Sequence, residues 1–75
     1  MVEQEHTLMR LAEVIRGMDA DPNRRLGLLF DVPEYAINIV CEAAKDSGCL
    51  PTVWRQRDGS VNIELRRVRP CDVLR

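Results

Sequence analysis

Hydrophobic residues near the start of the chain recur three or four positions apart. The series consists of Leu8, Leu11, Ala12, Ile15 and Met18. This spacing places all of them on one stripe of a helix, so it predicts a first helix over residues 4–18. Met9 and Val14 lie off that stripe and are candidates for contact with a second copy in a homodimer.

A second, short helix is predicted over residues 22–30. Asp21 is a good N-cap, and Pro22 at the first helical position loses no hydrogen bond. The buried side of this helix is expected to carry Leu26, Leu29 and Phe30. It ends before Pro33, because the residue preceding a proline is pushed out of helical geometry.

A third helix is predicted over residues 34–47, and it is the most regular of the three. Its apolar positions are Ile37, Val40, Cys41 and Ala44. Gly48 follows and can supply the left-handed cap that often ends a helix. We therefore expect this helix to be buried along one side.

After the third helix the period changes from 3.6 to 2, which predicts a hairpin over residues 51–69. Val61, Ile63 and Leu65 alternate with polar residues, and Asp58-Gly59 is a two-residue turn signal. A two-residue turn pairs Trp54 with Ile63, so Trp54 is expected in the core. The same register puts three arginines on the outward face: Arg55, Arg57 and Arg66. Residues 70–75 form a short tail.

The order of three helices and a hairpin resembles the winged helix-turn-helix family, and residues 23–42 (NRRLGLLFDVPEYAINIVCE) carry the resemblance. Apolar residues fall at the family's spacing at Leu26, Phe30, Val32, Ile37 and Val40. Gly27 stands where the two helices of the motif pass closest, and Asp31 stands at the left-handed turn position. The expected fold is therefore mainly α with a C-terminal β-hairpin (α+β), in which a two-stranded wing follows three helices.

The resemblance implies that the third helix reads bases in the major groove of duplex DNA. The residues that would face the groove are Glu34, Tyr35, Asn38, Ile39 and Glu42. Arg24 and Arg25 would reach the DNA backbone, and the three wing arginines would bind phosphate. The function implied is a small DNA-binding protein, a transcriptional regulator or accessory factor.

The distribution of charge supports a second interpretation. The net charge is only −1, because residues 1–50 carry −4 and residues 51–75 carry +3. An acidic third helix without arginine repels phosphate, whereas a bipolar surface suits protein partners. The alternative function is a protein-interaction adaptor or modulator that binds a protein partner on the same frame.

Composition excludes several other classes. A chain of 75 residues makes one domain, and it has no apolar run near the ~18 residues that a membrane span needs. Three widely spaced cysteines and one histidine, His6, predict neither a metal site nor a disulfide. No catalytic motif is present, so we expect no enzyme and no cofactor, and a cytoplasmic location.

Overall fold

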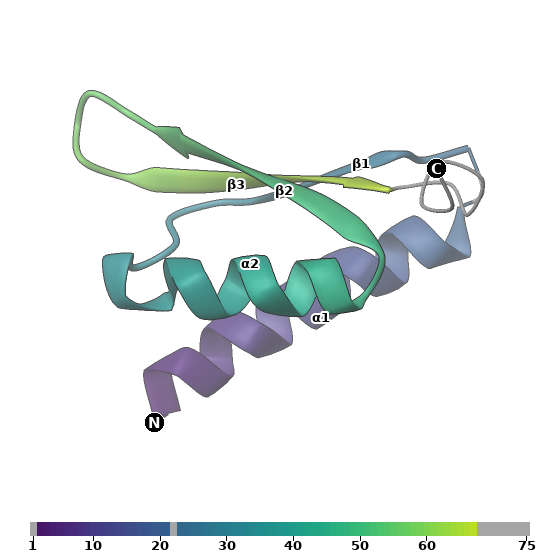
Figure 1. The fold of residues 1–75 in the computed structure, drawn as a ribbon, viewed down its shortest axis with the longest axis horizontal. Coiled ribbons are helices and arrows are strands. Elements are labelled where there is room, and N and C mark those ends of the chain that lie inside the picture. The colour runs from purple at the N-terminus through teal and green to yellow at the C-terminus, as the bar shows by residue number, and fades with distance from the viewer. Residues whose placement is uncertain (1, 22, 68–75) are drawn as a thin grey trace.

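The computed structural model of the protein describes residues 2–21 and 23–67. Their elements follow in the order α1 (Val2–Ala20), β1 (Leu26–Leu29), the 3-10 turn η1 (Glu34–Ala36), α2 (Ile37–Asp46), β2 (Cys49–Arg55) and β3 (Val61–Arg67). The strands form one antiparallel sheet in the order β1-β3-β2. Both helices lie on the same side of this sheet, so the fold has two layers (Figure 1).

The predicted architecture of three helices followed by a hairpin is wrong. The described residues form two helices and a three-stranded antiparallel sheet, an α+β fold whose first strand comes before α2. The segment expected to be the second helix is β1, which pairs with β3 from Leu26 opposite Arg66 to Leu29 opposite Ile63. A short apolar run fits a strand as well as a helix, and tertiary pairing decided between them.

Gly27 explains how closely β1 packs on α1. A Cβ added at Gly27 would lie 2.6 Å from Val14 Cγ1 and 2.8 Å from Met18 Sδ. The close approach is therefore between β1 and α1, and not between two helices as the sequence pattern indicated. Val14, proposed as a contact for a second copy, packs against the core of its own chain.

The other helix predictions are close to the structure. Leu11 and Met18 on α1 are buried, and so are Ile37, Val40 and Ala44 on α2. Gly48 follows α2 with φ 83°, which is the left-handed cap expected there. Asp31 also has a positive φ, 52°, although it follows a strand instead of a helix.

The hairpin differs from the prediction by one residue in register. Trp54 pairs with Asn62, not with Ile63. The Gln56 N–H donates to the Ser60 carbonyl (2.9 Å), and Gly59 has φ 90°, so the loop has three residues, 57–59. A shift of one residue turns every side chain of a strand to the other face. Trp54 is therefore 52% exposed, and its predicted place in the core is wrong.

The core lies between the helices and one face of the sheet, which we call the inner face. Its buried strand residues include Leu29 on β1, three residues of β3 and one of β2: Val61, Ile63, Leu65 and Cys49. Among the described residues, neither helix combines the length and hydropathy that crossing a membrane requires. The predicted tail, residues 70–75, lies outside the described residues.

Candidate functional site

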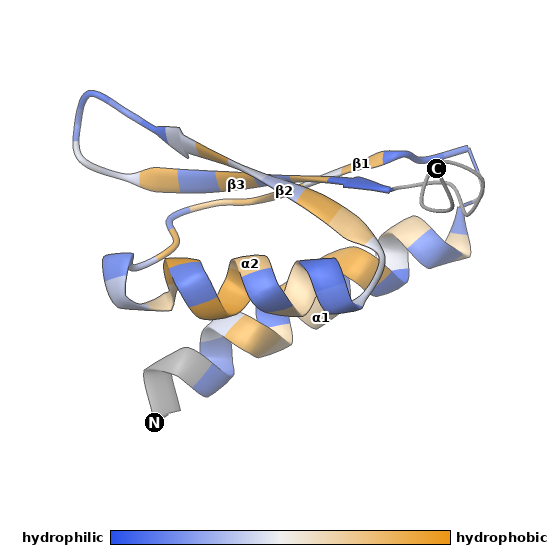
Figure 2. Ribbon diagram, viewed as in Figure 1, coloured by the Kyte–Doolittle hydropathy of each residue, from blue (hydrophilic) through white to orange (hydrophobic). Residues whose placement is uncertain are grey.

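The face of the sheet that points away from the helices is rich in large apolar side chains. We call it the outer face; it includes Leu26, Leu28, Phe30, Leu50 and Trp54. Each of these is about half exposed, between 47% and 53%. Figure 2 shows apolar stretches in β1 and at the start of β2 as well as along the helices. An exposed apolar patch on a small protein commonly marks an interaction surface.

A polar strip runs between these apolar borders along the central strand. Asn62, Glu64 and Arg66 alternate with the buried residues of β3, so they share the outer face. Arg66 lies between Leu26 and Leu50, and Glu64 lies between Leu28 and Thr52. The Trp54 indole Nε1 donates to Glu64 Oε1 (3.1 Å), which orients this carboxylate. The outer face thus combines two apolar borders with one acidic and one basic group.

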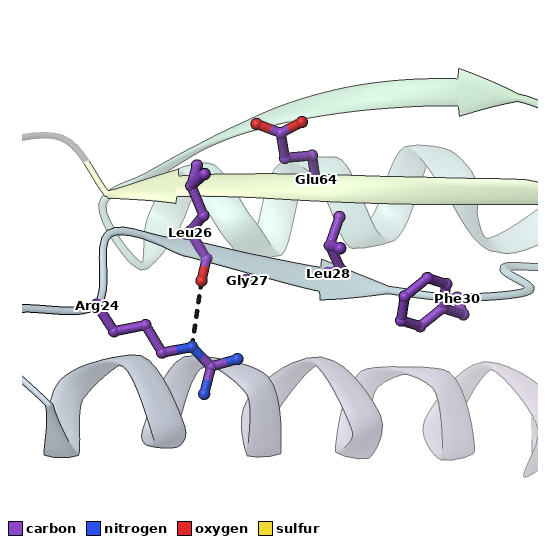
Figure 3. Close-up of a pocket in the computed structure, with 6 residues that line it drawn as sticks. All are labelled: Arg24, Leu26, Gly27, Leu28, Phe30 and Glu64. Carbon is purple, nitrogen blue, oxygen red and sulfur yellow. Dashed lines mark hydrogen bonds between the residues drawn. The ribbon is translucent and has the colours of Figure 1, made fainter.

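The outer edge of β1 lies beside a groove. A cavity of about 360 Å³ is lined by Arg24, Leu26, Gly27, Leu28, Phe30 and Glu64 (Figure 3). A second cavity, of about 340 Å³, shares Arg24, Leu28 and Phe30 with the first and extends over α1 to Arg10 and Val14. Arg24 crosses the groove, and its Nε donates to the Leu26 carbonyl (3.2 Å).

The ten residues predicted to bind DNA or a partner do not form one surface. Glu34 and Tyr35 lie in η1, and α2 presents Asn38, Ile39 and Glu42; all five are exposed, as predicted. The remaining five, Arg24, Arg25, Arg55, Arg57 and Arg66, are exposed too.

The predicted wing arginines are divided between the two ends of β3. Arg57 lies in the turn that precedes this strand, whereas Arg66 lies near its C-terminal end on the outer face. Arg55 pairs with Val61, a buried inner-face residue, and its Nη1 lies 2.9 Å from the Glu34 carboxylate. The expectation that Arg55 and Arg66 share an outward face is therefore wrong, because it depended on the incorrect register.

Arg24, Arg25 and Arg66 lie at the end of the sheet opposite the hairpin turn. Arg66 pairs with Leu26, which follows Arg24 and Arg25 directly. The Arg67 N–H donates to the Arg25 carbonyl (3.0 Å) and extends the pairing of β1 with β3. These three arginines are the part of the predicted set that the fold gathers.

The described cysteines are free thiols in a protected environment. Cys49 is buried and Cys41 is half-buried. Burial raises the pKa of both thiols, although Lys45 opposes this at Cys41 and Arg67 opposes it at Cys49. Within residues 2–21 and 23–67 no three side chains are grouped as ligands for a metal ion. A thiol with a raised pKa is a poor nucleophile at neutral pH.

Sequence reasoning missed the outer face and the groove. Burial alternates along β1, with Gly27 and Leu29 inward. All four residues of this strand are nonpolar, so its sequence carries no alternation that would have identified it. Nothing in the sequence neighbourhood of Arg10, on α1, indicates that its side chain reaches the end of β1. Its Nη2 donates to the Phe30 carbonyl.

Comparisons with known proteins identify no relative of this chain. No family model matches it, and neither does any curated protein or solved structure. The function of the outer face and the groove is therefore inferred from their own residues.

Proposed function

We propose that this chain is a non-catalytic protein-interaction module that docks through the outer face of its sheet. The observation that carries the proposal is the set of five large apolar side chains on that face, each about half exposed. Burying such a side chain fully is worth about 1.5–3 kcal/mol relative to leaving it in water. Covering this face would therefore supply the free energy for association.

A protein surface suits the outer face better than a nucleic acid does. Glu64 and Arg66 balance each other on the central strip, so the face presents no excess of positive charge. Phosphate binding depends on lysine and arginine that are free to neutralise it. Arg55 already pairs with the Glu34 carboxylate, so its guanidinium is less available to bind phosphate.

The occupant that best fits the outer face is a second copy of the chain. Glu64 and Arg66 lie two residues apart on the same face of β3. A two-fold axis between them, lying across the strands, would set each Glu64 against Arg66 of the other copy. The same axis would stack β1 on β1, so that Leu26 meets Leu28 of the second copy. Such an isologous contact buries the apolar borders and pairs both charges.

Charge-reversal variants test this arrangement in analytical ultracentrifugation of the purified chain. We expect the wild type to dimerise, and Glu64→Arg or Arg66→Glu alone to weaken the dimer by about tenfold or more, since like charges then face each other. The double variant Glu64→Arg with Arg66→Glu should restore association. Glu42→Arg, on the exposed side of α2, is the matched control and should have no effect. A monomer at every concentration, or a double variant as weak as the singles, would contradict the proposal.

DNA binding is the second candidate, and one observation favours it. Arg24, Arg25 and Arg66 lie together at one end of the sheet. If they bind phosphate, replacing both Arg25 and Arg66 by alanine should reduce the slope of log affinity against log salt by nearly 2. Fluorescence anisotropy with a labelled duplex at low and moderate salt measures this slope. Absence of binding at low salt would exclude this candidate and leave the protein-interaction function.

A further inference from the structure

The outer edge of β1 has backbone groups that no strand pairs with in the described part of the chain. Alternate residues of an antiparallel strand direct their N–H and C=O groups to the neighbouring strand. Arg25 directs its carbonyl to β3, where it accepts from the Arg67 N–H. Leu26, Leu28 and Phe30 therefore direct their backbone groups away from β3, toward the groove.

Two arginines occupy this edge, one at each end. Arg24 Nε donates to the Leu26 carbonyl (3.2 Å), and Arg10 Nη2 donates to the Phe30 carbonyl. Between them, the backbone of Leu28 has no hydrogen-bond partner on its outward side among the described residues. Charged side chains on an edge strand discourage indiscriminate pairing with other strands. The edge is therefore closed to most strands but has two cationic groups at a defined spacing.

The groove beside this edge is formed by two adjoining cavities. The two adjoining cavities, of about 360 and 340 Å³, share Leu28 and Phe30 in their walls. Val14 and Glu13 of α1 line the second cavity, and Val14 lies against Gly27, between Leu26 and Leu28. The middle of the groove thus favours a small apolar side chain and disfavours an acidic one.

We propose that the β1 edge binds an extended acidic segment of another protein as a fourth strand of the sheet. Leu26 and Phe30 are four residues apart, about 13 Å along a strand, and alternate side chains of an added strand share one face. The segment would place one carboxylate on Arg10 and one on Arg24, with a small apolar residue over Val14. The recognised pattern is acidic, any, apolar, any, acidic.

Carboxylates can displace the backbone carbonyls that Arg10 and Arg24 now bind. A hydrogen bond between guanidinium and carboxylate is about twice as strong as one to a neutral acceptor. The released carbonyls of Leu26 and Phe30, together with the backbone of Leu28, then pair with the added strand. In this mode of recognition the main-chain hydrogen bonds provide affinity, and the two arginines provide specificity for acidic segments.

Charge argues against a second copy of β1 as the occupant of this edge. Leu26–Leu29 contains no carboxylate, and Arg24 directly precedes Arg25 and this segment. Pairing β1 with β1 of another copy would bring Arg24 and Arg10 of both chains together. Leu26, Leu28 and Phe30 border both the groove and the outer face. Strand pairing uses their backbone groups with Arg10 and Arg24, whereas the outer-face contact uses side chains and the charges of Glu64 and Arg66, so the two proposals can fail independently.

Fluorescence anisotropy with short labelled peptides tests the proposal on the full chain. The probe has the sequence Ser-Glu-Thr-Val-Thr-Glu-Ser, and the control peptide carries lysine in place of both glutamates. We expect the acidic peptide to bind and the lysine peptide to bind at least about tenfold more weakly. Arg10→Ala and Arg24→Ala should each weaken binding of the acidic peptide by about tenfold. Arg57→Ala, in the hairpin turn, is the matched control and should bind as the wild type does.

NMR of the Leu28 amide keeps the test independent of whether each variant folds well. Addition of the acidic peptide to wild-type protein should shift this amide resonance and slow its hydrogen exchange, because the Leu28 N–H gains a partner. Leu50→Ala, which removes an outer-face side chain on β2 away from the groove, should leave peptide binding unchanged. Equal binding of both peptides, no response at Leu28, or protection of Leu28 by self-association without peptide would overturn the proposal.

Discussion

The two faces of the sheet differ in how deeply their apolar residues are buried. On β3 the two faces are sharply different, since Val61, Ile63 and Leu65 are buried while Asn62, Glu64 and Arg66 point outward. On β1 both faces are apolar, with Leu29 buried and Leu26 and Leu28 about half exposed. The inner face stabilises the fold against the helices. The large side chains of the outer face remain about half exposed in a single copy, which is the basis of the proposed contact.

The largest expected effect contrasts equivalent truncations on the two faces. Ile63 is fully buried on the inner face, so Ile63→Ala should cost about 2–5 kcal/mol and could unfold the domain. Leu28→Ala removes a half-exposed outer side chain and should change the free energy of unfolding of the monomer by only about 0.5 kcal/mol. Urea unfolding at a concentration that keeps the chain monomeric measures both. Equal losses would mean that the two faces are equally involved in folding.

A smaller effect is expected where the inner face approaches α1 most closely. Gly27→Ala would place a Cβ 2.6 Å from Val14 Cγ1, so α1 and β1 must separate, at a cost of about 1–3 kcal/mol. Val14→Ala in the same chain makes room for the new methyl group. Thermal melts should show the double variant to be less destabilised than the sum of the single variants. If the destabilisation of the double variant equals the sum for the two single variants, the contact between β1 and α1 is contradicted.

The ion pair between Glu34 and Arg55 connects η1 with the sheet at the exposed margin of the inner face. Both side chains are more than half exposed, at 68% and 61%, so the pair should stabilise the fold by only about 0.2–1 kcal/mol. A double-mutant cycle with Glu34→Ala and Arg55→Ala measures the coupling. A coupling above this range would show that the pair is a structural link and not a surface contact.

The smallest expected effect concerns the loop that sets the register of the two faces. The hydroxyl and the backbone N–H of Ser60 donate to Asp58, which lowers the pKa of that carboxyl. A lowered pKa in the folded state contributes stability above the pKa of the unfolded chain, about 3.9, and loses it as the pH falls through the folded value. The melting temperature of the wild type should fall as the pH drops below about 4, and in Asp58→Asn this fall should be smaller. Ser60→Ala should reduce the same decline, and a profile unchanged in both variants would contradict this role.

Several parts of the fold could be predicted from local sequence because local physics decides them. Leu11 and Met18 of the α1 stripe and the series Ile37, Val40 and Ala44 of α2 are buried as expected. Gly48 ends α2 in the left-handed conformation, which follows from the absence of a side chain at that position. The inward alternation of Val61, Ile63 and Leu65 was also correct.

The candidate site could be predicted only in part. The exposure of Asn38, Ile39 and Glu42 follows from their place opposite the apolar side of α2. The outer face could not be predicted, because it depends on whether β1 is a strand and on which side of β2 carries Trp54. The meeting of Arg10 with Phe30 joins residues twenty positions apart, and no local pattern specifies such a contact.

The sequence by itself determined where the buried helix stripes lie and which residues of β3 face inward, because these depend on periodicity within one element. Only the tertiary structure decided that Leu26–Leu29 forms a strand, since a short apolar run gains its conformation from pairing with β3 and packing on α1. The tertiary structure also decided on which face of the sheet Trp54 lies. A three-residue loop closed between Gln56 and Ser60 shifts the register of β2 by one residue. Such a shift moves each side chain of the strand to the opposite face of the sheet, and Trp54 therefore lies on the surface instead of in the core.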